Sequence, residues 1–309
     1  MSRYYHIQYL QHKEIDIQKW DRCIAVAENG LIYGYSFYLT HMAARWDALI
    51  YGDYEAVMPI TWNKKYGIAY LYQPFLAAQL GVFGNDISAD LLQSFLDAIP
   101  SRFRYWDIYL NHNNIFATEK FTLYQRKNFV LSLGKPYEEI CKNYRANTQR
   151  NIKKSNQFGC RAERDIPVDN VIELAVAQMR DYTKEPGDNI DQFRSLYHFL
   201  HKRKQATCYG VFSAKNELIS SCVFFFSHGR AYYILVGNHP DGRTLGASHA
   251  LIDSFIRDHA TDKLLLDFEG SDIRNLAFFY SSFGATEENY SAIRLNRLPF
   301  YLRWAKRSQ

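Results

Sequence analysis

The chain contains few of the residues that mark disulfide-rich, zinc-binding or linker-rich proteins. Its 309 residues include five cysteines, an odd number, and no two of them form a Cys-x-x-Cys pair. This number and spacing exclude a disulfide framework and indicate reduced thiols, as in a cytosolic protein. Eight prolines and sixteen glycines are also too few for a collagen-like or linker-rich chain.

Long apolar runs are missing as well. The runs at 223–226 and 264–266 are among the longest, and their strand-like length is too short to span a bilayer. Residues 1–20 are interrupted by charges and lack the apolar segment of a signal peptide. We therefore expect a protein without membrane insertion that is located in the cytoplasm.

Neither sign of charge dominates the sequence. The chain has 37 Lys and Arg against 32 Asp and Glu, and the net charge of +5 is smaller than a dedicated DNA-binding domain carries. It has no P-loop and no Gly-x-Ser-x-Gly motif. His198 and His201 share one face of an expected helix, but no third ligand is evident nearby, so we predict no metal site.

Apolar and aromatic residues, in contrast, are abundant. Hydrophobic residues make up 47% of the chain and aromatic residues 16%, with 24 Tyr and 21 Phe. This composition excludes disorder and supplies the cores of about two domains of ~150 residues each. The aromatic rings are typical of packed β-sheets, and the walls of a ligand groove are the alternative.

An internal repeat organises the chain. Residues 91–110 align without a gap onto 251–270, and in each copy an amphipathic helix leads into a short strand. The identical pairs are Leu91/Leu251, Ser94/Ser254, Phe95/Phe255 and Asp107/Asp267.

The flanks of the two copies agree with the repeat. Extended runs joined by turns precede each helix, and a short helix and a strand follow each copy. The preceding runs are 47–62 and 65–76 in the first copy and 207–226 and 229–240 in the second; the following helices and strands are 116–121 and 128–133, then 275–283 and 290–295. The order strand, strand, strand, helix, strand, helix, strand is used twice.

This order predicts an α/β (α+β) protein with two tandem domains, each a mixed and mostly antiparallel sheet flanked by helices. We expect an N-terminal domain over 1–134, a basic helical connector over 135–159, and a C-terminal domain over 160–309. The C-terminal domain should open with two helices, at 168–180 and 189–203.

The element order resembles the acyltransferase fold of the GNAT superfamily, here duplicated. Residues 129–163, FVLSLGKPYEEICKNYRANTQRNIKKSNQFGCRAE, are similar to the junction of FemAB-type transferases. There a strand ends the first domain, and a helix with a Glu-Glu pair and an Arg-Asn-Ile-Lys-Lys-like run follows. The stretch 264–285 also resembles the end of the second FemAB domain.

The resemblance implies a cytoplasmic enzyme that moves an acyl or aminoacyl group. FemAB proteins transfer amino acids from aminoacyl-tRNA to peptidoglycan precursors, and related tandem-GNAT proteins use other donors. The tRNA-using staphylococcal-type members carry a long coiled-coil insertion, whereas this chain has no sustained heptad run. Acyl-CoA, such as acetyl-CoA, is therefore the favoured co-substrate, and tRNA is the alternative donor.

One Gly-containing segment is the candidate donor site. It follows a strand and opens a helix, where free backbone N–H groups favour anions. Its residues resemble the loop with which GNAT enzymes hold the pyrophosphate of coenzyme A, and the alternative is an ordinary helix-capping loop. The candidate donor-binding residues are Arg243, Thr244, Leu245, Gly246, Ala247 and Ser248. The equivalent segment of the first domain, 77–84, has no Arg or Lys.

Two residues are candidates for the chemistry. In GNAT folds the strand that here covers 264–269 splays from its neighbour, so the resemblance makes Glu269 the candidate general base, with a turn-capping carboxylate as the alternative. Tyr280 and Gly284 show the Tyr-x-x-x-Gly spacing with which GNAT enzymes place a tyrosine that protonates the leaving thiolate. The alternative for Tyr280 is core packing. Asp267, repeated as Asp107, has an expected structural role.

The connector is the strongest local charge signal. It has no acidic residue between Glu139 and Glu163, and its cations spread over one half of a helix, opposite Ile140 and Tyr144. Such a face could hold the phosphates of a nucleotide-linked acceptor or of tRNA, and a solvated face is the alternative. The candidate substrate-binding residues are Arg145, Arg150, Lys153 and Lys154, next to Lys142.

Together these features predict an N-acyltransferase that moves an acyl or aminoacyl group from a thioester or ester to an amine. The acceptor would be an anionic small molecule or a cell-envelope precursor, held between the domains, and no cofactor would be tightly bound. A catalytically inactive tandem-GNAT binding module is the competing hypothesis, because a duplicated fold does not fix a function.

Overall fold

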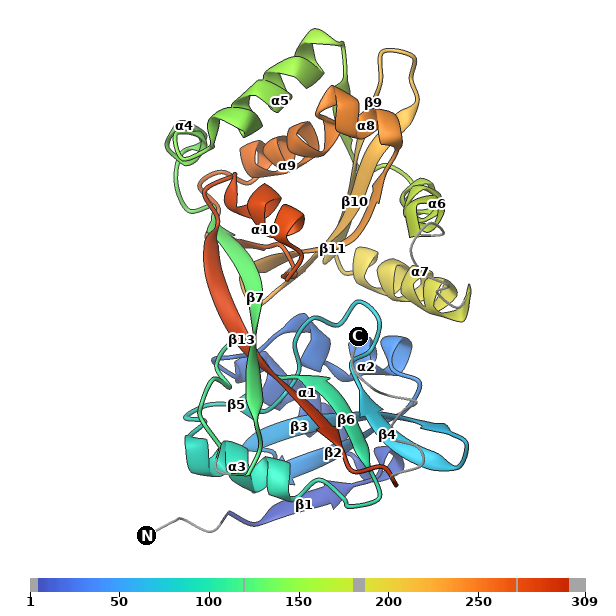
Figure 1. The fold of residues 1–309 in the computed structure, drawn as a ribbon, viewed down its shortest axis with the longest axis vertical. Helices are drawn as coiled ribbons and strands as arrows, with labels where there is room; N and C mark the ends of the chain where they lie inside the picture. Colours follow the sequence, from blue (N-terminus) through green and yellow to red (C-terminus); the bar gives the residue numbers. More distant parts are fainter. Residues whose placement is uncertain (1–4, 119, 180–186, 271, 300–309) are drawn as a thin grey trace. The chain divides into compact units, whose positions relative to one another are not determined.

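The computed structural model describes residues 5–118, 120–179, 187–270 and 272–299. The chain forms two compact units (Figure 1). Unit 1 contains residues 1–126 and 289–309, and unit 2 contains residues 127–288. In the described ranges, no helix is both long enough and apolar enough to cross a membrane.

Unit 1 is a mixed sheet with helices packed against it. The strands follow the order β1-β2-β3-β4-β6-β13, and β5 also pairs with β3. The β4·β6 pair is parallel, and the other pairs are antiparallel. The elements are β1 (Ile7–Leu10), α1 (Ile17–Val26), α2 (Ser36–Met42), β2 (Trp46–Tyr51), β3 (Ala56–Lys65), β4 (Ile68–Tyr72), β5 (Phe83–Gly84), α3 (Ala89–Asp97), β6 (Tyr105–Tyr109) and the outer part of β13 (Thr286–Asn296), with single 3-10 turns at His12–Glu14 and Ile32–Gly34.

Helix α3 shows how the sequence specifies this unit. The Ser88 hydroxyl accepts a hydrogen bond from the Leu91 N–H and caps the first turn. The apolar residues of the helix then recur at helical spacing, so that Leu92 and Phe95 are fully buried against Trp106 and Ile108 of β6. The expected helix and strand of the first repeat are therefore confirmed.

Unit 2 contains the strand order β7-β12-β11-β10-β9-β8, which is again mixed. Only the β11·β12 pair is parallel among these strands. The elements are β7 (Leu123–Ser132), α4 (Tyr137–Cys141), α5 (Ala146–Gln157), β8 (Arg161–Arg164), α6 (Val168–Met179), α7 (Gly187–His201), β9 (Ala206–Phe212), β10 (Leu218–Ser227), β11 (Arg230–Asn238), α8 (Pro240–Leu245), α9 (Ala247–Asp258), β12 (Leu265–Asp267) and α10 (Arg274–Ser281). The two helices expected at 168–180 and 189–203 are thus present, and Arg180 lies outside the described residues.

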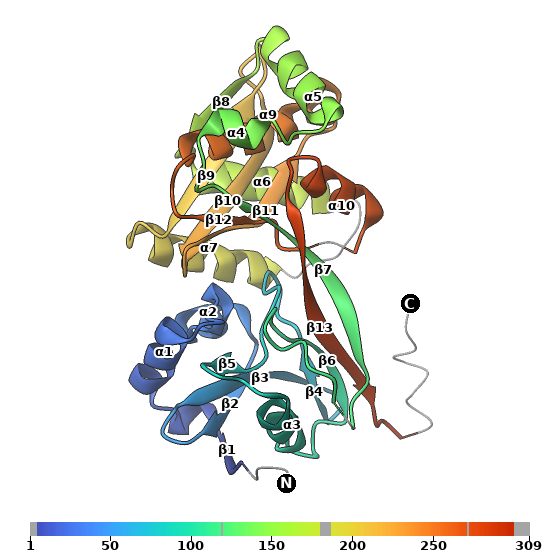
Figure 2. The same ribbon diagram turned by 90° about the vertical axis from the view of Figure 1, so that its left-hand side faces the viewer.

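Helices cover both faces of the unit 2 sheet (Figure 1 and Figure 2). On one face, Phe255 of α9 stacks on Phe224 of β10 with ring centroids 3.7 Å apart. On the other face, α6 lies so close to β11 that a Cβ on Gly237 would be 2.6 Å from the backbone nitrogen of Ala175. Glycine is therefore required at 237 by close packing.

The repeat is visible in the register of the parallel strands. Tyr72 of β4 faces Asp107 of β6, and Tyr232 of β11 faces Asp267 of β12. The alignment of 91–110 onto 251–270 brings the first aspartate onto the second, so both copies use the same parallel pairing. The duplicated, mixed and mostly antiparallel fold is confirmed.

The last strand of each copy, however, pairs with the other copy. Strand β7, which ends the first copy, pairs with β12, and β13, which ends the second copy, pairs with β6. The compact units group the end of β13, from residue 289, with unit 1, whereas the domain boundaries expected from the sequence lie at 134 and 160. Self-comparison reveals the order of elements but not which copy a strand joins.

Two local expectations also differ from the structure. No helix forms at 116–118 or 120–121, where the Thr118 hydroxyl instead closes a turn with the backbone of Phe121; Glu119 lies outside the described residues. The connector 135–159 is not one helix but two, α4 and α5, and it belongs to unit 2.

Candidate active site at the end of β12

Strands β11 and β12 part in the middle of unit 2. They pair in parallel from Arg230 and Leu265 to Tyr232 and Asp267. Beyond this point β11 continues to Asn238, while the chain after β12 turns away; the Phe268 N–H still bonds to the carbonyl of Phe129 on β7. In the described residues, β11 has no strand partner on this side after Tyr232, so an opening forms in the sheet.

Glu269 stands at this opening. Its backbone φ is +66°, and the following Gly270 has φ of +80°. A left-handed conformation is unfavourable for a residue with a Cβ, so contacts around it must hold it. The strand ends at Asp267, and Glu269 does not continue its alternation, contrary to the expected strand over 264–269.

The electrostatic setting of Glu269 suits acid–base chemistry. Glu269 as a whole residue is partly exposed, but its carboxyl group is surrounded by protein atoms. This desolvation raises the pKa of the carboxyl well above its ordinary value. A carboxylate with a raised pKa is a stronger base than a solvated one.

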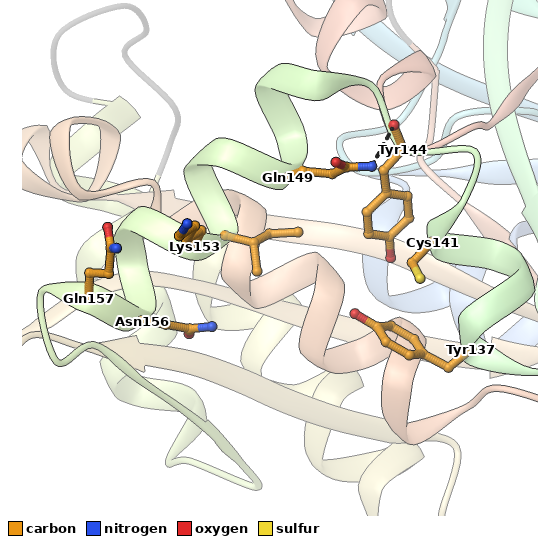
Figure 3. A pocket seen from close by; sticks show the side chains of 8 residues that line it. Tyr137, Cys141, Tyr144, Gln149, Lys153, Asn156 and Gln157 are labelled. Atoms are coloured by element: carbon orange, nitrogen blue, oxygen red, sulfur yellow. Dashed lines mark hydrogen bonds between the residues drawn. The ribbon is translucent and has the colours of Figure 1, made fainter.

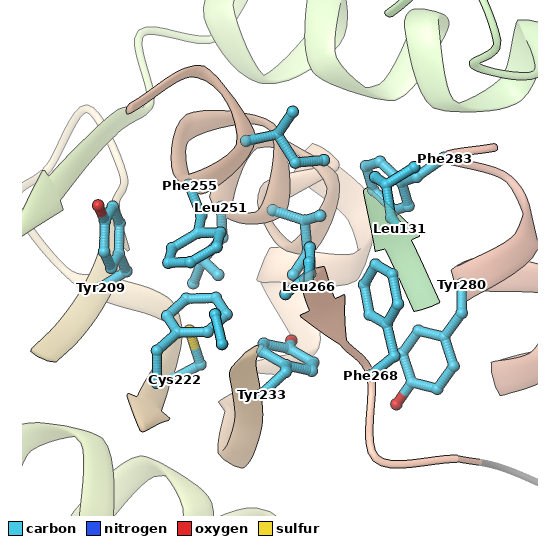
Figure 4. Packing of buried hydrophobic residues seen from close by; sticks show 14 of the residues in the cluster. Leu131, Tyr209, Cys222, Tyr233, Leu251, Phe255, Leu266, Phe268, Tyr280 and Phe283 are labelled. Atoms are coloured by element: carbon cyan, nitrogen blue, oxygen red, sulfur yellow. The ribbon is translucent and has the colours of Figure 1, made fainter. Parts of the chain in front are cut away.

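Tyr280 of α10 lies near enough to Glu269 for the two groups to interact electrostatically. Its ring stacks on Phe268 with centroids 4.8 Å apart, and the residue is only 8% exposed (Figure 4). Burial raises the pKa of the Tyr280 hydroxyl, and the charge of Glu269 raises it further. The ring therefore belongs to the core, as the alternative interpretation held, while the hydroxyl stays protonated near the carboxylate.

A buried ion network lies under this pair. Arg230 Nη1 donates to Asp267 Oδ2 at 2.9 Å, and the same guanidinium donates twice to Glu288, each at 2.9 Å. Asn128 Nδ2 donates to Asp267 Oδ1 at 2.9 Å. Burial is the main cause of a raised pKa at Asp267, and Arg230 opposes it. The expected structural role of Asp267 agrees with these contacts.

The sequence-based reasoning did not find Arg230, Asn128 or Glu288. One signal was available for Arg230, which is the only charged residue of the strand Arg230–Asn238 and is 9% exposed. A charge at the start of a buried strand requires a partner. Asn128 and Glu288 carried no comparable signal, since both lie next to other polar residues.

The segment 243–248 is not an open loop. Residues 240–245 form α8, and Gly246, with φ of +74°, joins it to α9. A Cβ on Gly246 would be 2.4 Å from the carbonyl oxygen of Asn151, so α5 covers this junction. Ala247 is fully buried, and the Ser248 hydroxyl donates to Asn238 Oδ1 at 2.6 Å.

The remaining members of this set point outward. Arg243 and Thr244 are exposed, and Leu245 is half-buried. Next to the covered junction, burial lowers the pKa of His249 to about 4, so its imidazole is neutral at pH 7. Sequence reasoning missed this coverage because no local pattern in 243–248 reports a helix from elsewhere in the chain.

The cations of the connector lie on the outer side of unit 2. Arg145, Arg150 and Lys153 are exposed, and Lys154 is half-buried. The Arg145 guanidinium lies 4.9 Å from the ring centroid of Phe278, an exposed residue of α10. Ile140 and Tyr144 are buried on the opposite side, as expected.

Lys153 also borders a cavity of about 540 Å³ between α4 and α5 (Figure 3). The other lining residues are Tyr137, Cys141, Tyr144, Gln149, Ile152, Asn156 and Gln157. Neither Glu269 nor Tyr280 lines this cavity, so the basic helix and the candidate acid–base pair are separate features of unit 2.

The comparisons with known proteins identify the fold class. Residues 142–273 match the family model described as acetyltransferase (GNAT) domain, so this segment is a GNAT domain. The part of the chain that matches the family model includes β8 to β12 and therefore the opening at Glu269. The chain has a FemAB-like GNAT acyltransferase fold. No curated protein matches the chain in sequence.

Solved structures resemble nearly the whole chain. The crystal structure of FemX gives a TM-score of 0.61 at 14% identity, covering 96% of this chain and 99% of that chain. A conserved protein of unknown function from Bacteroides thetaiotaomicron gives 0.59 at 12% identity, covering 95% and 100%. The C-terminal domain of a putative lysylphosphatidylglycerol synthetase from Agrobacterium fabrum gives 0.59 at 9% identity, covering 94% of each. At these identities the likeness concerns the fold.

Proposed function

We propose that the protein transfers an acyl or aminoacyl group from an ester or thioester donor to an amine, with Glu269 as general base. The observation that carries this proposal is the position of Glu269 at the opening between β11 and β12. There the pKa of the carboxyl is raised, and its charge acts on the hydroxyl of Tyr280. The GNAT fold of residues 142–273 supports the reaction class.

The proposed step needs only these two side chains. The acceptor nitrogen attacks the donor carbonyl, a C–N bond forms, and the C–O or C–S bond to the leaving group breaks. Glu269 takes the proton of the attacking amine, and the Tyr280 hydroxyl donates to the leaving oxygen or sulfur. Desolvation raises the pKa of the buried thiols of Cys208 and Cys222, which makes these two residues poor covalent nucleophiles.

The proposed donor is an aminoacyl ester rather than acyl-CoA. Acyl-CoA would place its pyrophosphate at the start of α9, the site expected from Arg243 to Ser248. There Asn151 of α5 lies against Gly246, and Ala247 is fully buried. The structural neighbours fit this choice, since one is FemX and another is by its name a synthetase of a lysine-bearing lipid. The exposed cations Arg145 and Arg150 would then contact the phosphates of tRNA.

Hydroxylamine tests the proposal without knowledge of the natural acceptor, because it is a small amine that forms a hydroxamate with either donor. Purified protein is mixed with hydroxylamine and with acetyl-CoA or a mixture of aminoacyl-tRNAs, and hydroxamate formation is measured. We expect acceleration with aminoacyl-tRNA, and we expect Glu269→Gln to be about 100-fold slower.

Acceleration with acetyl-CoA alone would contradict the choice of donor but keep the enzyme. No acceleration with either donor, or equal acceleration by Glu269→Gln, would contradict the proposed function and favour the binding module.

A further inference from the structure

We propose that Asp267 is a positioning residue that holds the backbone of Glu269 and thereby directs the catalytic carboxylate into the opening. This inference rests on the proposed function, in which Glu269 is the base. The Glu269 N–H donates to Asp267 Oδ1 at 3.0 Å, so the carboxylate of one residue fixes the peptide of the other.

The left-handed conformation of Glu269 requires such a contact. A residue with a Cβ at φ of +66° is strained relative to a right-handed or extended residue. Gly270 follows at φ of +80°, and a Cβ added to it would be 2.6 Å from the carbonyl oxygen of Lys127. The hydrogen bond from the Glu269 N–H to the Asp267 carboxylate is made by the strained residue itself. Because its acceptor is charged, this hydrogen bond is strong.

Asp267 is itself fixed from two sides. Arg230 of β11 holds Oδ2, and Asn128 of β7 holds Oδ1. Both partners are buried, and the Asp267 side chain is only 3% exposed, so its carboxylate cannot turn toward water. The route from Arg230 and Asn128 through Asp267 to Glu269 is therefore continuous and rigid.

The first copy of the repeat offers a matched control. Asp107 occupies the same register as Asp267, but its ion pair with Arg294 is longer, at 3.3 Å, and both side chains are partly exposed. Strand β6 continues to Tyr109, whose N–H donates to Gln73 Oε1 rather than to Asp107. The aspartate of the first copy therefore holds no left-handed residue.

The test compares Asp267→Asn with Asp107→Asn. Selective ¹³C labelling of glutamate carboxyls allows the titration of Glu269 to be followed by NMR, with its signal assigned by its loss in Glu269→Gln. When the turn relaxes, the Glu269 carboxyl reaches water, and its pKa should fall by about one unit or more toward the ordinary value. Asp107→Asn should leave this titration unchanged.

A kinetic readout accompanies the titration. In the hydroxylamine assay, Asp267→Asn should lower kcat at least about tenfold while KM for the donor changes little, because orientation of the base matters only in the reacting state. If Asp267→Asn does not fold, Asn128→Ser offers a milder change, because it removes the hydrogen bond that Asn128 donates to the Asp267 carboxylate. A smaller shift of the Glu269 pKa in the same direction is then expected.

The outcomes separate the two proposals. An unchanged titration of Glu269 in a folded Asp267→Asn or Asn128→Ser protein would overturn the positioning role, whatever the activity. A shifted titration in a protein that forms no hydroxamate would support the positioning role and contradict the proposed function. An equal shift in Asp107→Asn would also overturn the inference, because the effect would then not depend on the contact.

Discussion

The two copies of the repeat use the same strand register but surround it with different chemistry. The alignment that places Asp107 on Asp267 places Tyr109 on Glu269, and the strand registers place Tyr70 of β4 at the position of Arg230 of β11. In unit 2, the Asp267–Arg230 pair has side chains that are 3% and 10% exposed; in unit 1, the Asp107–Arg294 pair has side chains that are 28% and 40% exposed. Duplication has kept the fold, while burial and charge at the end of the strand differ.

The backbone differs in the same place. In unit 1 the strand runs on through Tyr109, which is an ordinary extended residue. In unit 2 the strand stops at Asp267, and Glu269 turns into the left-handed region. Only the second copy combines a buried ion pair, Arg230–Asp267, with a glutamate whose backbone is strained. This is the arrangement expected of a site under functional constraint.

The largest expected difference between the copies is in stability. Arg230→Leu leaves Asp267 and Glu288 buried without their shared cation, and should lower the free energy of unfolding by about 3–5 kcal/mol. Arg294→Leu removes a partly exposed ion pair and should cost under about 1 kcal/mol. Urea unfolding of both variants measures the difference. Equal losses of unfolding free energy in the two variants would show that the two ion pairs stabilise their units equally and would contradict the difference expected between the copies.

The second difference concerns two left-handed glycines. Gly246 lies against Asn151, whereas Gly67 in the β3–β4 turn of unit 1 has φ of +79° and no atom within 4 Å of an added Cβ. Both alanine substitutions cost roughly 1–2 kcal/mol for the backbone. Gly246→Ala should cost about 1–3 kcal/mol more, because α5 must move. Equal costs in urea unfolding would mean that α5 does not cover the start of α9.

The smallest expected effect is on the pH dependence of stability. The pKa of Glu269 is raised in the folded protein, so the native state holds more protons than the unfolded state above about pH 4.3. The free energy of unfolding should therefore fall as the pH rises from there to the folded pKa. Glu269→Gln should make this fall shallower, and Glu55→Gln, which changes an exposed residue of unit 1, should not. A steeper fall in Glu269→Gln would contradict the sign.

Much of the fold could be predicted because the repeat is written in local patterns. The alignment of 91–110 with 251–270 located α3, β6, α9 and β12, and element order indicated the GNAT fold. The exchange of β7 and β13 could not be predicted in this way. The sequences of β7 and β13 do not indicate whether each strand pairs with β6 or with β12. In the structure β7 pairs with β12, and β13 pairs with β6.

The candidate site could be predicted in part. The resemblance to GNAT folds made Glu269 and Tyr280 candidates, and in the structure the charge of Glu269 acts on the Tyr280 hydroxyl. The left-handed φ of Glu269 was not predicted, because it accompanies a hydrogen bond to Asp267, whose own orientation depends on Arg230 and Asn128 from other strands. Gly246 is covered by Asn151 of α5, which is nearly a hundred residues away in sequence. Local sequence patterns extend over about 11–18 residues and cannot report such a contact.

The central claim is that Glu269, and not its counterpart Tyr109, is the base of an acyl transfer. The most direct measurement is the rate of hydroxamate formation from aminoacyl-tRNA between pH 5 and 9 for the wild type, Glu269→Gln and Tyr109→Phe. The wild type and Tyr109→Phe should share one rate increase through the raised pKa of Glu269, and Glu269→Gln should be about 100-fold slower without that increase. An unchanged profile in Glu269→Gln would contradict the account.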